Sequence, residues 1–304
     1  MKLNIISSLI LGSAAMLAVS SAQAVYPFIG KDFTIYSYNP NPHGSAWEAT
    51  KEAEAIWAAN RLLGDGLTLV PGSAGHNGAY MYQIGVATTV KNPDLSCKDG
   101  GNAWLCGSAP KDDRLMLSSG WYQSHWSGSY GAVYGKDNPT GTGGNAALSA
   151  LIADTPTYDQ MTLTFEFTVD PWVTAITASF IFASDEFGSV LPNNDVFALW
   201  IDGKNYALLP DGSVVSVHNI GDNWVDGKDY GYKGRTEEIW FTALLDPTLA
   251  THTITIAIAD ATNGYGLSTV FLSQITAVPE PETWAMLLAG LGLVGVTAKR
   301  RRQK

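Results

Sequence analysis

Apolar and polar positions alternate most clearly in the second half of the chain. Between residues 162 and 169, every second side chain is apolar and those between are mainly Thr or Glu. A period of two predicts a strand with one buried face. Similar alternation, or a short continuous apolar run, predicts further strands at 67–70, 80–89, 176–182, 196–201, 204–209, 214–217, 239–244, 253–259 and 269–277.

One segment has the pattern of a helix instead. Ser45 and Glu48 have the spacing of a capping box, and apolar residues that include Ile56, Trp57 and Leu63 follow mostly on one face. Gly64 is expected to cap its carboxyl end. The sequence therefore predicts a mainly β fold, an antiparallel β-sandwich of jelly-roll type, with one N-terminal helix packed on it. Residues 91–144 lack regular pattern and are expected to form a loop-rich insertion.

Both ends of the chain resemble processing segments. Lys2 precedes an apolar stretch, and Ala22-Gln23-Ala24 has the small-x-small pattern of a cleavage site. Residues 1–24 are thus predicted to be a secretory signal peptide, removed by signal peptidase. Residues 25–277 are left as one domain, and 278–304 as a C-terminal membrane segment.

This C-terminal segment has three parts in a fixed order. Prolines that oppose regular structure come first, then an apolar run of about 15 residues, then a basic cluster that favours the cytoplasmic side. The tail resembles the PEP-CTERM sorting signal of bacterial surface proteins. The residues that carry the resemblance are Pro279, Glu280, Pro281, Trp284, Arg300, Arg301 and Arg302. The resemblance implies transient insertion of a transmembrane helix in the inner membrane, recognition by an exosortase, and a final place at the cell surface or outside it. An ordinary membrane anchor is the alternative.

Charge and cysteine content agree with export. The chain has 304 residues and a formal charge of −10, which becomes about −16 once the six basic residues of the terminal segments are removed. An acidic surface argues against a nucleic-acid partner. Cys97 and Cys106 are expected to form one disulfide in an oxidising compartment.

Oxygen-bearing side chains gather between two predicted strands. Asp185 and Glu186 follow one strand, while Asn194 and Asp195 precede the next. Carboxylate and amide oxygens suit Ca²⁺, which takes six to eight oxygen ligands, so these four residues are candidate calcium ligands. The alternative is that they only stabilise turns.

The same region resembles the choice-of-anchor L domain. The quoted motifs are FASDEFGS from Phe182, NNDVFALWIDG from Asn193 and ITIAIADATNGYGLSTVFL from Ile254, and the likeness spans most of residues 46–272. It implies a surface domain of undefined molecular activity. The chain departs from the family pattern at Lys233 and Leu267, positions where an acidic residue is common.

Three functions are compatible with these features. The first is a structural or adhesive role at the cell surface or in an exopolysaccharide matrix. The second is a carbohydrate-binding module, in which the aromatic residues of the insertion would stack on sugars: Trp121, Tyr122, Trp126 and Tyr130. The third is a polysaccharide-acting enzyme, which is not favoured because no nucleophile elbow or histidine metal motif occurs. We expect His252 to be a solvated turn residue.

Overall fold

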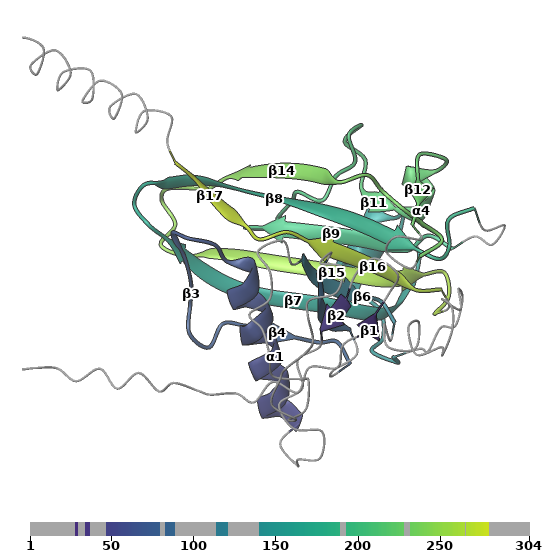
Figure 1. Ribbon diagram of the computed structural model, residues 1–304, viewed down its shortest axis with the longest axis horizontal. Coiled ribbons are helices and arrows are strands. Elements are labelled where there is room, and N and C mark those ends of the chain that lie inside the picture. Colours follow the sequence, from purple (N-terminus) through teal and green to yellow (C-terminus); the bar gives the residue numbers. More distant parts are fainter. Residues whose placement is uncertain are drawn as a thin grey trace, which may run out of the picture.

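The fold is a stack of two antiparallel sheets. The computed structural model describes residues 28–29, 34–36, 47–79, 83–88, 114–120, 140–188, 193–227, 232–264 and 266–279. Within these residues, every pairing between named strands is antiparallel, and helices are few (Figure 1). The prediction of a mainly β, sandwich-like domain is therefore confirmed. The jelly-roll connectivity and the C-terminal transmembrane helix stay predictions.

The first sheet is built around a long central strand, β8 (Val173–Ser184). The order of its main path is β1-β2-β5-β6-β16-β8-β13-β12, and β14 and β17 also pair with β8. The bounds of these strands are β1 Phe28–Ile29, β2 Thr34–Tyr36, β5 Ile84–Thr88, β6 Arg114–Ser118, β12 Val225–Asp226, β13 Gly234–Arg235, β14 Ile239–Leu244, β16 Ser268–Leu272 and β17 Thr276–Pro279.

The second sheet is built around β15 (His252–Ala261), which pairs with β7 (Thr157–Val169) on one side and β9 (Val196–Ile201) on the other. Its main path is β10-β9-β15-β7-β3, with β11 also on β9 and β4 also on β7. The remaining bounds are β3 Leu67–Leu69, β4 Gly75–His76, β10 Lys204–Asn205 and β11 Val215–Ser216. Asp202 and Gly203 both have positive φ, 50° and 79°, as a two-residue hairpin between β9 and β10 requires.

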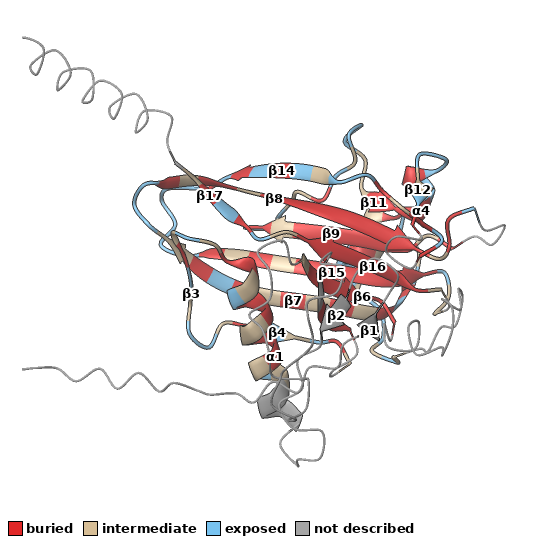
Figure 2. Ribbon diagram, viewed as in Figure 1, coloured by how far each residue is buried: buried red, intermediate tan, exposed pale blue. Residues whose placement is uncertain are grey.

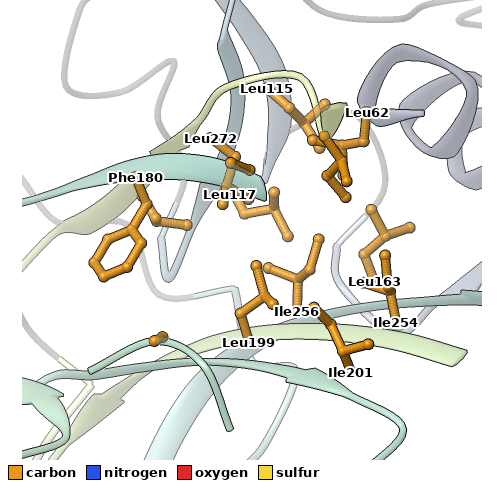
Figure 3. Close-up of a cluster of buried hydrophobic side chains, with 14 of the residues drawn as sticks. Leu62, Leu115, Leu117, Leu163, Phe180, Leu199, Ile201, Ile254, Ile256 and Leu272 are labelled. Atoms are coloured by element: carbon orange, nitrogen blue, oxygen red, sulfur yellow. The ribbon is translucent and has the colours of Figure 1, made fainter. Parts of the chain in front are cut away.

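The core lies between the two sheets. Figure 3 shows Leu115, Phe180 and Leu272 of the first sheet facing Leu199 and Ile256 of the second. The rings of Phe180 and Phe197 meet across the layers, with centroids 5.2 Å apart. The predicted alternation is visible in β7, where Leu163, Phe165 and Phe167 are fully buried. Full burial of each such side chain contributes about 1.5–3 kcal/mol, so this layer is a large stabilising contribution.

Helix α1 (Trp47–Leu62) closes one side of the sandwich. It contacts β5 and β6 of the first sheet and β4 and β7 of the second (Figure 1). The predicted contact residues do pack on the core: Leu63 is buried in it, and the half-buried Ile56 and Trp57 lie against it. The fully buried apolar positions of the helix are mainly small. Small side chains let the helix approach both sheets closely. The buried apolar positions are Ala55, Ala58, Ala59 and Leu62.

Gly64 has a different role from the predicted helix cap. Its φ is not in the left-handed region, and a Cβ at this position would lie 2.6 Å from the Ile275 carbonyl oxygen. The Gly64 amide donates to that same oxygen at 3.0 Å. Glycine is therefore needed for close approach of two backbones, which joins the end of α1 to the strand region before β17.

Two predicted boundaries need correction. The range 91–144 contains β6, an inner strand that pairs with both β5 and β16, so it is not a loop-rich insertion throughout. At the other end, β17 pairs with β8 as far as Pro279, two residues beyond the predicted end of the domain at 277. Among the residues that the structure describes, no helix combines the length and apolarity needed to span a membrane.

Candidate functional site

A group of buried polar residues lies at one end of the sandwich, where α4 (Val217–Ile220) and β12 are seen in Figure 1. Four strand ends meet here. Glu186 follows the end of β8 and Asp195 comes immediately before β9, while Asp260 lies near the end of β15 and Ser268 begins β16. Since β8 and β16 belong to one sheet and β9 and β15 to the other, the group bridges both layers. Figure 2 shows this end of these strands as buried.

Asp195 is the fully buried centre of this group. Its Oδ1 accepts a hydrogen bond from the Ala261 amide at 3.0 Å, and its Oδ2 accepts one from the Ser268 hydroxyl at 2.6 Å. The Ser268 hydroxyl also lies 2.8 Å from Ser184 Oγ. Hydrogen bonds to a charged acceptor contribute about 1.5–3 kcal/mol each, so Asp195 joins the two sheets.

Glu186 points into the same group. Only 4% of its surface is exposed, and neither carboxylate oxygen accepts a hydrogen bond of normal geometry from the described residues, although the side chains of Asp195 and Asn193 lie near. Its amide donates to Ser184 Oγ at 3.0 Å. The next residue, Phe187, is buried and stacks on Trp224 with ring centroids 5.9 Å apart, which fixes the turn after β8.

The electrostatics of the two carboxyls are coupled. Burial, and then the Asp195 charge, raise the pKa of Glu186 to about 10. Burial also raises the pKa of Asp195 to about 6, although hydrogen bonds from Ser268 and the Ala261 amide oppose the shift. Neither carboxylate forms an ion pair with a Lys, Arg or His side chain among the described residues. Buried carboxyls without a cation favour the protonated form.

The two other predicted ligands lie elsewhere. Asp185 is half-buried, and its Oδ1 accepts from the Lys233 amide at 3.1 Å. Asn194 uses its side-chain oxygen to accept from the His218 amide at 2.9 Å, at the start of α4. The structure thus brings together Glu186 and Asp195 of the four candidates, and directs Asp185 and Asn194 to separate backbone contacts.

The departures from the family pattern both occur beside Asp185. Lys233 contacts the Asp185 carboxylate through its amide, and the Leu267 carbonyl accepts the Asp185 amide at 3.1 Å. The side chain of Leu267 is buried. Lys233 and Leu267 therefore form part of the surroundings of Asp185.

Sequence reasoning missed Asp260 and Ser268. Asp260 is fully buried, and its carboxyl interacts with that of Asp195. The pairing of β15 with β7 shifts register between Ile258 and Asp260, and all residues from Ile256 to Ala261 are buried. Period two places Asp260 on the same inner face as Ile254, Ile256 and Ile258, so an acid in this apolar series was the available signal.

The prediction for His252 was wrong. This residue is 2% exposed, its Nδ1 lies 2.7 Å from Asp202 Oδ2, and its ring lies 5.5 Å from that of Phe167. A second buried histidine pair joins α1 to β4, where His76 Nε2 lies 3.1 Å from Glu54 Oε2 and both side chains are fully buried. Both pairs support the fold at positions away from the acidic group.

Several predicted sites lie outside the described residues. These are the disulfide at Cys97 and Cys106, the stacking residues Trp121, Tyr122, Trp126 and Tyr130, the signal peptide, and the sorting residues after Pro279. Within the described part of the chain, no three His, Cys, Asp or Glu side chains are arranged to hold a metal ion.

Comparison with family models gives two matches. The model described as "Choice-of-anchor L domain" matches residues 107–276, which is more than half of the chain. The one described as "PEP-CTERM protein-sorting motif" matches residues 277–302. The boundary between the two matches falls within β17. The likeness noted from residue 46 onward is supported from residue 107.

Similarity to individual proteins is slight. No curated protein matches the chain. Among solved structures, a β-glucosidase from Kluyveromyces marxianus in complex with glucose is 10% identical over 45% of this chain and 12% of its own, with a TM-score of 0.23. The enzymatically active domain of tailspike protein 4 from bacteriophage CBA120 is 9% identical over 70% of this chain and 20% of its own, with a TM-score of 0.21. The chain thus spans a fifth or less of these structures, and such TM-scores do not define a shared fold.

Proposed function

Because the chain belongs to the choice-of-anchor L domain family and ends in a PEP-CTERM sorting motif, we propose that it is an exported surface protein with a structural or adhesive role. The observation that carries the proposal is the order of the two matches, a folded domain to residue 276 and a sorting motif from residue 277. The motif implies processing by an exosortase. After processing, the acidic domain would stand at the cell surface or in an exopolysaccharide matrix.

The test of sorting uses the full chain in a bacterium that carries an exosortase. We expect the protein to reach the surface or medium in a form shortened at its C-terminus, as measured by intact mass. Deletion of the exosortase, or replacement of Arg300, Arg301 and Arg302 by Gln, should leave the unprocessed chain in the membrane fraction. A matched control replaces Lys51 and Arg61 of α1 by Gln, which leaves the sorting motif intact. Normal processing without the exosortase would contradict the proposal.

The role after sorting is tested by loss of the protein. A structural or adhesive function predicts weaker cell aggregation or a thinner matrix in a deletion strain, restored by the wild-type chain. A version that folds and is exported but restores neither property would contradict it. We assign no catalysis to the domain. Polysaccharide turnover that disappears in Asp185→Asn would overturn this assignment.

Carbohydrate binding is the second candidate, and exposed aromatic residues favour it. Trp240 of β14 is 65% exposed, and its neighbour on the same face, Leu244, is 79% exposed. Figure 2 shows the exposed positions along this strand. An exposed aromatic ring can stack on a sugar. Glycan-array binding that is lost in Trp240→Ala or in Trp126→Ala would favour this function, and silence on arrays of matrix polysaccharides would favour the structural role.

A further inference from the structure

The turn after β8 buries a carboxylate for which the described residues provide no charge partner. Glu186 is almost fully buried, both of its carboxylate oxygens lack a hydrogen-bond donor of normal geometry, and the Asp195 carboxyl lies beside it. Among the described residues, no Lys, Arg or His side chain forms an ion pair with Glu186 or Asp195, so no cationic side chain there compensates their charge.

Such an arrangement is unstable if both groups are charged. Removing a carboxylate from water is unfavourable, and two neighbouring carboxylates also repel each other. Asp260 adds a third buried acidic side chain next to Asp195. Since the described residues supply no cationic side chain, protons or a bound cation are the two ways to compensate the group that this part of the chain leaves open.

We propose that the carboxylates of Glu186 and Asp195 bind one calcium ion at this end of the sandwich. Two carboxylates would neutralise the ion's charge, and Asp260 would add a further negative charge nearby. Three converging acidic side chains are not required, because calcium completes six to eight ligands with hydroxyl, amide, backbone and water oxygens. Ser184 and Ser268 place hydroxyl oxygens within the same group.

The chemistry of the group favours calcium over other metals. Its polar side chains offer oxygen donors, whereas zinc and copper sites use Cys or His. Magnesium requires near-ideal octahedral geometry and keeps several waters, which a buried group of this kind does not favour. The proposed export would also bring the domain into an environment where calcium sites of about 10⁻⁴–10⁻³ M affinity are common.

The Glu186 carboxylate leaves no room for a side chain at Gly266. Gly266 has φ of +95°, and a Cβ on it would collide with the Glu186 carboxylate. A glycine here lets β16 begin directly against the carboxylate, which keeps Glu186 beside Asp195. The site thus depends on the position of two strand ends, β8 and β16, as well as on the two acids.

Calcium binding is tested on the purified full chain after dialysis against EGTA at pH 7.5. Isothermal titration with CaCl₂ should show one ion per chain, with Kd at or below about 10⁻³ M. The melting temperature should rise with the logarithm of CaCl₂ concentration, because the ion binds the folded state. MgCl₂ at the same concentration should produce a much smaller rise.

Matched variants locate the ion. Glu186→Gln removes one charge at nearly constant shape and should weaken calcium binding about tenfold or more, since ligand charge sets affinity. Asp185→Asn changes the adjacent carboxylate, which faces the Lys233 amide, and should leave the affinity within about twofold. If Asp195→Asn does not fold, Glu186→Gln together with the wild-type titration still decides the matter.

Two results would overturn the inference. One is a folded wild-type chain with the same melting temperature in CaCl₂ and EGTA and no bound calcium, in which case protons alone neutralise the group. The other is calcium binding that Glu186→Gln leaves unchanged but Asp185→Asn abolishes. Neither result bears on sorting, since the exosortase experiment depends on the C-terminal motif.

Discussion

The Ser268 hydroxyl donates a hydrogen bond of 2.6 Å to Asp195 Oδ2, and so joins the start of β16 in one sheet to the residue before β9 in the other. Both residues are fully buried. The bond therefore acts as a polar crosslink at the end of an otherwise apolar sandwich.

Loss of this crosslink should destabilise the domain. Ser268→Ala removes the donor and leaves a buried carboxyl oxygen without it, so the free energy of unfolding should fall by about 1.5–3 kcal/mol. Urea unfolding monitored by tryptophan fluorescence measures the change. Ser213→Ala is the matched control: Ser213 also donates to an aspartate, Asp211 at 2.7 Å, but in an exposed turn. The free energy of unfolding of Ser213→Ala should fall by less than about 0.5 kcal/mol. Equal decreases in Ser213→Ala and Ser268→Ala would contradict the role of Ser268 as a crosslink.

Without calcium, stability should fall as pH rises from 5 to 8. The pKa of Glu186 is raised to about 10 and that of Asp195 to about 6 in the folded state, both above their unfolded values. The folded state therefore holds protons that the unfolded state has released, and their stabilising effect is lost as pH rises. Thermal melts in EGTA across this range measure the slope.

The matched variant isolates the acidic group from other titrating residues. Glu186→Gln should flatten the pH dependence, and Glu52→Gln, on the exposed face of α1, should not change it. Saturating CaCl₂ should also flatten the dependence in the wild type if the ion replaces the protons. An unchanged slope in Glu186→Gln would show that the pH dependence arises elsewhere.

The buried pair of Glu54 and His76 should hold α1 to the second sheet. Their side chains are fully buried, with Nε2 and Oε2 3.1 Å apart. Removing one partner leaves a buried polar group uncompensated, so Glu54→Ala should reduce the free energy of unfolding by about 3–5 kcal/mol. A double-mutant cycle with His76→Ala measures the coupling, and additive effects of the two substitutions would contradict a direct interaction.

Close backbone contact at Gly64 should make alanine costly there. Gly64→Ala places a Cβ 2.6 Å from the Ile275 carbonyl oxygen, and overpacking of this kind costs about 1–3 kcal/mol. Gly75→Ala is the control, because nothing lies within 4 Å of its added Cβ. It should be neutral or slightly stabilising. Denaturant midpoints compare the two, and a larger loss in Gly75→Ala would contradict this account.

The local sequence pattern predicted those strands in which apolar side chains alternate, or run together, in the way that their burial requires. The bounds predicted for β9 and β14 agree with the structure, and the alternation in β7 matches its buried face. It failed for β6, where Arg114–Ser118 is a short apolar run inside a stretch that lacks regular pattern. That segment is a strand because β5 and β16 pair with it on both sides, a relationship between residues distant in sequence.

The sequence by itself determined the fold class of the domain and the presence of a C-terminal sorting motif. Both depend on local patterns, namely period-two burial in the strands and the ordered residues of the sorting motif. Only the tertiary structure decided which acids meet. Glu186 and Asp195 meet, with Asp260 beside Asp195, because strand ends of both sheets lie together at one end of the sandwich, while Asp185 and Asn194 are held by nearby amides. Side-chain direction at a strand end depends on turns and register, which one stretch of sequence does not specify.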